Sequence, residues 1–363
     1  MEENNVKPWV VWLFAIISIL IIGPLCFWLG RQFSNKEDNK KDEQEVSWVE
    51  KNEVISLASD YDHLYLLENN KNVKIANINR DDGLYFYDQE KVYVIQYSYD
   101  NKSSEVGYYD LLKNNEYHKV FSPDLSLSPE SIIVLENHIY LTFNQSKDIL
   151  DYDMDSKETK KLTYFDDYFE KASYGSFLLF RTFNNKVFYW TRGTSDVDAE
   201  LGEINLKNGE KKLIASNVYL EYVYGDKLIY RQYSTEDNNS YGQYFEYDTS
   251  KNKSVEISDK KIDLGGSVSY SLIVPYKNYY VYAYEGYIYE YQDGKEKEIA
   301  HLDDLYIGTI TLISNDTVLI TNDSDMCLMG ECDLISYRFN LDSYELKEDK
   351  DNERLYAYVH YVK

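Results

Sequence analysis

Short apolar runs separated by polar turns occupy most of the chain. From about Glu53 onward, the runs are rich in aromatic and β-branched residues, and Asn, Asp, Gly and Lys lie between them. Almost no segment has the period of a helix, so the pattern predicts β-strands joined by turns. One kind of strand, apolar and preceded by a turn residue, recurs at residues 91–95, 138–141, 186–190, 227–230, 278–281 and 316–320.

Several of these units share the same internal order of strands. A further strand, which ends in Tyr-Asp or an equivalent pair, occurs at residues 107–110, 150–153, 202–205 and 245–248. A more polar strand, as expected where a strand faces water, closes the unit at residues 160–163, 211–214, 254–257 and 296–299. The repeat length of about 40 to 50 residues is that of one propeller blade. We predict an all-β fold, a β-propeller of about seven four-stranded blades over residues 53–363, with six or eight blades as alternatives.

The two ends of this region complement each other. Strands at residues 63–67 and 73–78 form a unit that is one strand short, whereas the run at residues 355–362 has no unit of its own. A propeller leaves no long exposed edge when its terminal strands share one blade. We therefore expect the C-terminal strand to complete the first blade and close the ring.

An apolar segment without a charged side chain precedes this region, at residues 9–30. At 1.5 Å per residue it spans about 33 Å, the thickness of the hydrocarbon core of a membrane. Aromatic residues lie near both of its ends, where they favour the level of the lipid headgroups. We predict one transmembrane helix between a short tail at residues 1–8 and a polar juxtamembrane linker at residues 31–52.

Two other interpretations of the segment are a cleaved signal peptide and a lipoprotein processed at Cys26. A signal peptide has an apolar region of about 7 to 15 residues and a cleavage site of small residues. Neither feature is present, and bulky Leu25 before Cys26 is a poor match to lipoprotein processing. The sequence favours an uncleaved anchor.

The charge of the chain limits its partners. The 363 residues include 38 Lys and Arg against 63 Asp and Glu, a formal net charge of −25. Such a surface repels polyanions, so we expect no nucleic-acid partner. Hydrophobic residues make up 44 % of the chain, which is enough to build a packed core.

Two features bear on the side of the membrane that the large domain occupies. More basic residues follow the apolar segment than precede it, which by the positive-inside rule places the domain in the cytoplasm, although long domains translocate with little regard to charge. Cys327 and Cys332 form an isolated close pair, as expected for a local disulfide in an oxidising compartment. The other interpretations are unrelated thiols or half a metal site. We expect a single-pass protein of the cell membrane with an extracytoplasmic propeller.

The run Val187-Phe188-Tyr189-Trp190-Thr191 resembles the YWTD blade motif of the low-density lipoprotein receptor propellers, with Arg192 in place of the Asp. The repeated strand, turn and Tyr-Asp pattern is more similar to uncharacterised membrane-anchored bacterial propellers related to that group. The resemblance covers residues 50–363 and implies a binding or scaffolding ectodomain. It transfers no catalytic residue.

Candidate chemistry is sparse. His63 and His138 occupy what we interpret as the same repeat position, at the start of the second strand of a blade, where either a metal or acid/base pair or a turn residue would fit. The alternate acids of residues 151–155 resemble a calcium loop but lack its turn glycine and terminal Glu, so a hairpin is the other interpretation. No metalloprotease or serine-nucleophile motif is present. We expect no metal, no cofactor and no enzymatic activity.

Tyrosine carries the best functional signal, with 39 residues in the chain. Alternate tyrosines should pack between blades, but two dense clusters exceed what one face buries, and exposed Tyr is a preferred anchor at binding surfaces. The candidate binding residues are Tyr280, Tyr282, Tyr284, Tyr287, Tyr289 and Tyr291. They predict a scaffold that binds a protein or a cell-envelope ligand. The alternatives are an envelope hydrolase of glycan or peptide with its site in the propeller channel, and a cytoplasm-facing assembly platform.

Overall fold

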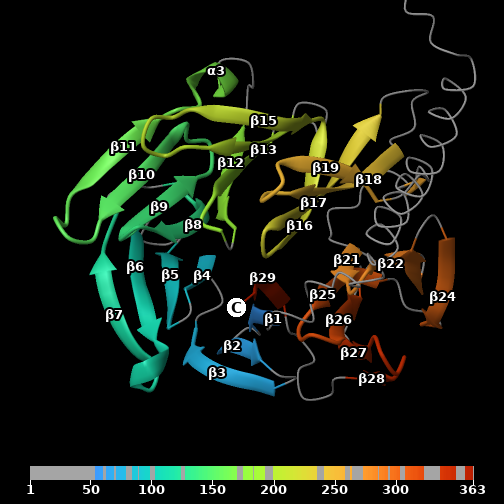
Figure 1. The fold of residues 1–363 in the computed structure, drawn as a ribbon. Coiled ribbons are helices and arrows are strands. Elements are labelled where there is room, and N and C mark those ends of the chain that lie inside the picture. The colour runs from blue at the N-terminus through green and yellow to red at the C-terminus, as the bar shows by residue number, and fades with distance from the viewer. Residues whose placement is uncertain are drawn as a thin grey trace, which may run out of the picture. The chain divides into compact units, whose positions relative to one another are not determined.

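The structure, a computed structural model, describes residues 54–59, 63–68, 71–78, 84–88, 90–98, 103–123, 127–169, 175–182, 184–192, 199–234, 241–257, 262–263, 273–284, 286–292, 295–302, 307–322, 336–348 and 356–362. Their strands form seven sheets that surround a common centre (Figure 1). The predicted seven-bladed all-β propeller is therefore confirmed.

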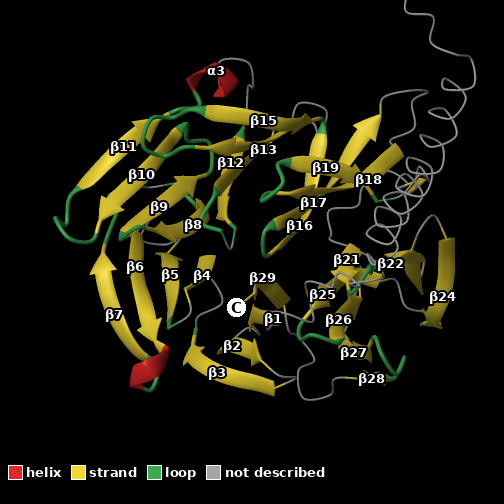
Figure 2. Cartoon of the chain, in the orientation of Figure 1, coloured by secondary structure: helices red, strands yellow, loops and turns green. Residues whose placement is uncertain are grey.

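The blades follow one another along the chain, and loops connect them (Figure 2). The first blade contains β1 (Val54–Ser59), β2 (His63–Glu68), β3 (Lys71–Asn77) and β29 (Tyr356–Val362). The second contains β4 (Leu84–Asp88), β5 (Lys91–Ser98), β6 (Ser103–Asp110) and β7 (Glu116–Phe121), with the short helix η1 (Leu111–Lys113). The third contains β8 (Pro129–Leu135), β9 (His138–Phe143), β10 (Asp148–Asp153) and β11 (Thr159–Thr163), followed by α3 (Asp166–Phe169).

The other four blades continue this order. The fourth contains β12 (Ser176–Arg181), β13 (Val187–Arg192), β14 (Glu200–Ile204) and β15 (Lys211–Ser216). The fifth contains β16 (Val218–Tyr224), β17 (Lys227–Ser234), β18 (Tyr241–Asp248) and β19 (Lys253–Glu256), with β20 (Ile262–Asp263) also paired to β18. The sixth contains β21 (Ile273–Tyr276), β22 (Tyr279–Tyr284), β23 (Tyr287–Gln292) and β24 (Lys295–His301), and the seventh β25 (Ile307–Leu312), β26 (Thr317–Asn322), β27 (Ser336–Asn340) and β28 (Leu346–Glu348).

The C-terminal strand closes the ring as predicted. β29 pairs antiparallel with β1 and takes the innermost place in the first blade, so the sheet order is β29-β1-β2-β3. This closure pairs an edge of β1 that would otherwise be open. Because β29 is innermost, β1, β2 and β3 each lie one place further from the centre than the first three strands of the other blades do.

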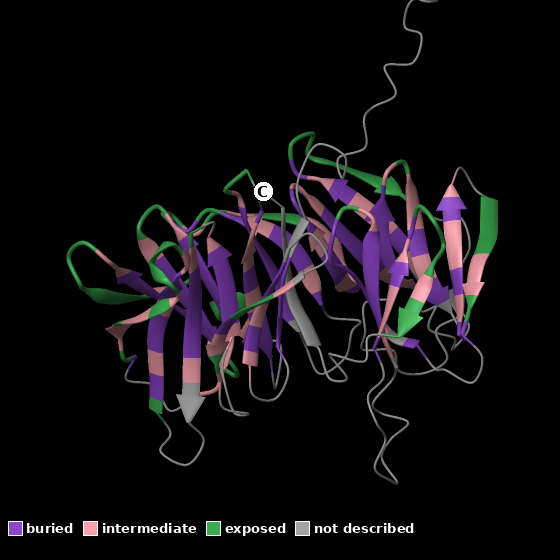
Figure 3. Ribbon diagram, turned by 90° about the horizontal axis from the view of Figure 1, so that it is seen from below, coloured by how far each residue is buried: buried purple, intermediate pink, exposed green. Residues whose placement is uncertain are grey.

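Burial follows the distance from the centre. Inner strands such as β8 and β21 are largely buried, whereas the outermost strands β11, β19 and β24 are mostly exposed (Figure 3). Apolar residues of neighbouring blades pack against one another; Phe165, beside the third blade, stacks on Phe177 of the fourth at 4.1 Å between ring centroids. The polar outer strands expected from the sequence are thus observed.

The Tyr-Asp pattern at the end of the third strand has a local physical cause. The carboxylate of Asp153 accepts hydrogen bonds from the backbone N–H groups of Asp155 and Ser156, and Asp248 does the same for Ser250 and Lys251. An Asp or Asn side chain that binds the backbone two residues ahead stabilises a tight turn. The motif therefore specifies the hairpin into the fourth strand.

Among the residues that the structure describes, no helix is long and apolar enough to cross a membrane. The predicted transmembrane helix at residues 9–30, its flanks at residues 1–8 and 31–52, and the predicted disulfide of Cys327 and Cys332 lie outside the described residues.

Candidate functional site

The candidate tyrosines gather on one face of the sixth blade. Tyr280 lies opposite Tyr291, Tyr282 opposite Tyr289, and Tyr284 opposite Tyr287 in the antiparallel pairing of β22 and β23. Residues directly opposite each other, and residues two apart on one strand, share a face of the sheet. We call the face that carries these six positions the tyrosine face. The density of tyrosines in the sequence predicted these residues, and the register brings them together.

Stacked rings run across the tyrosine face from strand to strand. The ring centroids of Tyr282 and Tyr289 lie 5.1 Å apart with planes 21° from parallel, and Tyr287 lies 6.1 Å from Tyr289. Tyr287 also stacks on His301 of β24 at 3.9 Å. The result is a continuous aromatic surface over β22, β23 and β24.

Carboxylates border this surface. The hydroxyl of Tyr282 donates to Glu296 Oε1 at 2.6 Å, and the hydroxyl of Tyr280 donates to Glu246 Oε2 of the fifth blade at 2.5 Å. Burial and the neighbouring carboxylates raise the pKa of both hydroxyls well above the usual tyrosine value. These tyrosines therefore stay neutral and act as hydrogen-bond donors.

The tyrosine face is buried at one end and open at the other. Tyr291 is only 6 % exposed and belongs to a core cluster shared with the fifth and seventh blades. Tyr280, Tyr282, Tyr287 and Tyr289 are half-buried, and Glu296, Glu298 and His301 on the outer strand are exposed. The structure does not describe the side chain of Tyr284. The exposed part of this face therefore lies near β24.

A buried ion pair, which sequence reasoning missed, lies in the fifth blade. Arg231 Nε is 2.9 Å from Glu221 Oε1, and the two side chains are 1 % and 0 % exposed. The rings of Tyr219 and Tyr233 flank the guanidinium carbon, with centroids at 5.2 Å and 5.1 Å. The sequence does hold one signal of this pair: Glu221 is a single acidic residue within the apolar run of residues 218–224.

A β-bulge positions Glu221. The pairing of β16 with β17 shifts its register between Leu220 and Tyr222, which makes Glu221 the extra residue of the inner strand. Burial raises the pKa of Glu221 to about 7, and the positive charge of Arg231 opposes this increase. The carboxyl group of Glu221 thus has a pKa near neutral pH, although its side chain is sealed from solvent.

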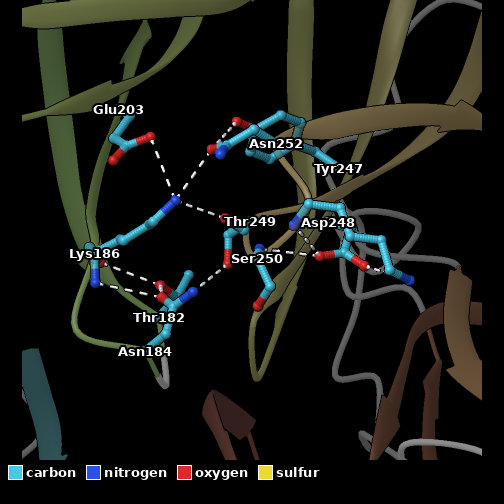
Figure 4. Close-up of polar contacts among 10 residues, drawn as sticks. Thr182, Asn184, Lys186, Glu203, Tyr247, Asp248, Thr249, Ser250 and Asn252 are labelled. Carbon is cyan, nitrogen blue, oxygen red and sulfur yellow. Dashed lines mark hydrogen bonds and ion pairs between the residues drawn. The ribbon is translucent and has the colours of Figure 1, made fainter.

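Polar contacts join the fourth and fifth blades at their turns (Figure 4). Lys186 Nζ donates to the carbonyl of Thr249 at 2.6 Å and to Asn252 Oδ1 at 3.1 Å, and it lies 3.9 Å from Glu203 Oε2. The side-chain amide of Asn184 donates to Thr249 Oγ1 at 2.9 Å. We call the contacts of Lys186 and Asn184 with Thr249 and Asn252 the polar clasp. The donors lie in the fourth blade and the acceptors in the fifth, so the clasp holds the two turns together.

Arg181, the last residue of the inner strand of the fourth blade, contacts residues of the second and third blades. Its guanidinium donates to Asp88 Oδ1 at 2.9 Å and to the carbonyl of Val134 at 2.5 Å, and it lies over the ring of Phe86. Asp88 and Val134 belong to the inner strands β4 and β8. The arginine therefore neutralises an acid on an inner strand and ties the second, third and fourth blades together.

The two histidines do not share a repeat position, so that interpretation was wrong. His138 begins the second strand of its blade, but His63 begins β2, the third strand of a blade whose innermost strand is β29. His138 Nδ1 lies 2.7 Å from Asp151 Oδ1, and Lys160 Nζ lies 3.0 Å from the other oxygen.

Lysines occupy the place of His138 in two other blades. Lys227 pairs with Glu246 at 2.7 Å, and Lys186 lies near Glu203, at positions that match His138 and Asp151 in register. A basic side chain beside an acidic one thus recurs at this place in three blades. Because a lysine serves equally well, the histidine has a structural role at this place.

The acids that resembled a calcium loop do not converge on one point. Asp151 binds His138 and Lys160, whereas Asp153 caps the following turn through backbone N–H groups. Within the described parts of the chain, no group of three His, Cys, Asp or Glu side chains is arranged to hold a metal ion. The hairpin interpretation of residues 151–155 agrees with these contacts.

Comparison with known proteins gives likeness in fold alone. No family model matches the chain, and no curated protein matches it. A structure from a study of two prolyl endopeptidases has 9 % identity and a TM-score of 0.54, over 85 % of this chain and 50 % of that one. A nidogen/laminin complex has 14 % identity and a TM-score of 0.42, over 84 % and 96 %. The β-propeller domain of the Trilobed protease from Pyrococcus furiosus has 12 % identity and a TM-score of 0.46, over 79 % and 88 %.

Proposed function

We propose that the protein is a binding scaffold of the cell envelope, held by one transmembrane helix at residues 9–30, with its propeller outside the cytoplasm. A partner binds the tyrosine face of the sixth blade. The observation that carries the proposal is the alignment of the six predicted tyrosine positions on one face, with an outer rim of exposed side chains. Rigid aromatic side chains on a fixed sheet are suited to recognition because little conformational entropy is lost on binding.

Two inner-strand acids favour a scaffold over a hydrolase. A hydrolase in the channel would need two carboxylates, or a nucleophile and a base, that face a substrate. Asp88 is neutralised by Arg181, and Glu221 is sealed beside Arg231 with no exposed surface. Each of these two carboxylates thus has a basic partner within the chain.

Site-specific photo-crosslinking in intact cells tests the binding surface. Tyr287 is replaced by p-benzoylphenylalanine, and the control carries the same group at Leu213, which is 52 % exposed on the outer strand of the fourth blade. We expect a discrete adduct from position 287 and none from position 213. No adduct, or the same adduct from both positions, would contradict the proposal.

Cysteine labelling tests the location. In a C26S variant, Cys327 and Cys332 are treated with a membrane-impermeant maleimide in intact cells, with and without prior reduction. We expect labelling only after reduction, as a disulfide outside the cytoplasm requires. Labelling that needs permeabilised cells but no reductant would place the propeller in the cytoplasm.

A further inference from the structure

The outermost strands of the blades differ in how regularly they pair. In the first, second, fourth and sixth blades, this strand contains a β-bulge, at which one extra residue has no partner on the neighbouring strand. The extra residues are Ile75, Val120, Ile214 and Ile299. In the fifth and seventh blades, the outermost strands β19 and β28 have only four and three residues. A bulge or a short strand makes the edge of a sheet poorly suited to further pairing.

The outermost strand of the third blade, β11, has neither feature. All five of its residues, Thr159–Thr163, pair with β10 without a shift of register. β11 is the last strand in the order of its sheet, and β10 is the only described strand that pairs with it (Figure 1). Four of its five side chains are exposed, and Leu162 is half-buried. Because an edge strand carries a row of backbone N–H and C=O groups that face away from its sheet, β11 offers a regular edge to a further strand.

Two lysines determine which strand fits this edge. Lys160 and Lys161 are consecutive, so their side chains lie on opposite faces of the sheet. Lys160 Nζ lies 3.0 Å from Asp151 Oδ2, and Lys161 Nζ lies 4.0 Å from Asp148 Oδ2. The two lysine side chains are nevertheless 63 % and 60 % exposed. An ammonium group has three donors, so each lysine can bind a second carboxylate.

The same lysines disfavour a second copy of this chain as the added strand. If two β11 strands paired antiparallel about their centres, Lys161 of one copy would face Lys161 of the other, and like charges directly opposite each other are destabilising. Two consecutive acidic residues would instead form one opposite-charge pair with each lysine. The net charge of −25 does not prevent this, because at physiological ionic strength charges are screened beyond about 8 Å.

We propose that an extended segment of a partner protein, with two consecutive acidic residues, adds to β11 as a fifth strand of the third blade. Backbone hydrogen bonds to the edge of β11 supply the affinity. The carboxylates opposite Lys160 and Lys161 supply the specificity. This surface lies in a different blade from the tyrosine face, so the inference goes beyond the proposed function and does not depend on it.

Fluorescence anisotropy with labelled peptides tests the inference on the full-length protein in nonionic detergent. The probe is the peptide Thr-Val-Glu-Glu-Val-Thr, and one control replaces both glutamates with glutamine. We expect the glutamine peptide to bind about fivefold more weakly. Two further controls are glutamate peptides with N-methyl groups on alternate backbone nitrogens, one set for each edge of the peptide strand. Only one of these two should lose binding, because an added strand uses the N–H groups of one edge.

Charge reversal locates the binding. In K160E/K161E, we expect the preference for the glutamate peptide over the glutamine peptide to invert. The matched control is K212E/K253E, which makes the same change of charge at exposed lysines of β15 and β19 and should keep the wild-type preference. If K160E/K161E fails to fold, K161E alone serves and should halve the preference, to about twofold. In the wild type, the glutamate peptide should slow hydrogen–deuterium exchange in residues 159–163 and leave residues 211–216 unchanged.

Several outcomes would overturn the inference. Binding of both methylated peptides, or of neither the glutamate nor the glutamine peptide, would exclude strand addition at this edge. Equal binding of the glutamate and glutamine peptides would exclude the lysines as the source of specificity. Equal effects of K160E/K161E and K212E/K253E would show a response to net charge alone. None of these outcomes affects the crosslink from position 287, which judges the proposed function separately.

Discussion

The contacts of the fifth blade with its two neighbours differ in kind. Toward the fourth blade, the polar clasp joins turns through Lys186, whose side chain is 30 % exposed. Toward the sixth, Tyr222, Tyr224 and Tyr244 pack into a buried core, and Tyr244 lies opposite Arg231 of the buried ion pair. One contact is a set of hydrogen bonds at a rim, and the other is an aromatic interior that contains two charges.

This difference bears on which parts of the molecule contribute most to stability and which part we propose to bind a partner. Partly solvated polar contacts fix geometry at little cost, because water can replace any partner that is lost. A buried charge that is sealed from water is stabilised by an opposite charge beside it, so the removal of one member of the pair is costly. Tyr280, Tyr282 and Tyr291 of the tyrosine face pack in or against the same core. The rigid base thus lies inside, and the proposed binding surface lies at the exposed rim.

The largest effect is expected from the buried ion pair. E221L removes the carboxylate beside the buried guanidinium of Arg231 and should lower the free energy of unfolding by about 3 to 5 kcal/mol. The double variant E221L/R231M removes both charges and should regain most of that loss. Urea denaturation of wild type, single and double variants measures this, and an equal loss in single and double variants would show that the pair contributes only through packing.

The second prediction concerns pH. The pKa of Glu221 in the folded protein, about 7, lies above its ordinary value of 4.5, so the folded state holds the proton more tightly than the unfolded state does. The stability that this group contributes is fully present below pH 4.5 and is lost as the pH rises through about 7. The difference in unfolding free energy between wild type and E221L/R231M should therefore fall from pH 5 to pH 8. A difference that stays constant or rises would refute the raised pKa.

The polar clasp should yield a smaller change. K186M removes two hydrogen bonds at the junction of the fourth and fifth blades and should cost about 1 to 2 kcal/mol. The control K212M alters an exposed lysine of the outer strand in the fourth blade and should cost less than about 0.5 kcal/mol. Thermal unfolding compares the two, and equal losses would mean that the clasp adds nothing.

The turn cap next to the clasp is expected to matter less. D248A removes the acceptor for the backbone N–H groups of Ser250 and Lys251 and should cost about 1 kcal/mol. The control D155A changes an exposed acid in the equivalent turn of the third blade, where Asp153 provides the cap. An effect of D155A as large as that of D248A would contradict the assigned role of the Tyr-Asp motif.

The smallest effect tests the structural role of His138. H138K introduces the residue found at the matching positions 186 and 227, so unfolding free energy should change by less than about 0.5 kcal/mol. Its charge still meets Asp151. Loss of partner crosslinking from position 287 in this variant would instead assign the histidine a part in function.

The repeating strands made the fold predictable because blade packing and turn chemistry are local. Asp153 and Asp248 each specify a turn within a few residues, so their pattern could be recognised along the chain. Ring closure by β29 was predictable for a related reason, since one unit lacked a strand and one strand lacked a unit.

The candidate site was predictable only in part. The tyrosine positions came from local density, but their common face depends on the pairing of β22 with β23. Glu221 and Arg231 lie on different strands, and the bulge that aligns them leaves no periodic signal. The shared position assigned to His63 and His138 failed because strand β29, distant in sequence, shifts the place of His63 in its blade.

Hydrogen–deuterium exchange of the full-length protein, with and without the partner that the crosslink from position 287 identifies, tests the central claim most directly. The account predicts slower exchange in residues 279–301, which form the tyrosine face and the outer strand of the sixth blade. Residues 182–192 and 247–257, around the polar clasp, should be unchanged. Protection at the clasp, or protection nowhere in the sixth blade, would contradict the assignment of recognition to the tyrosine face.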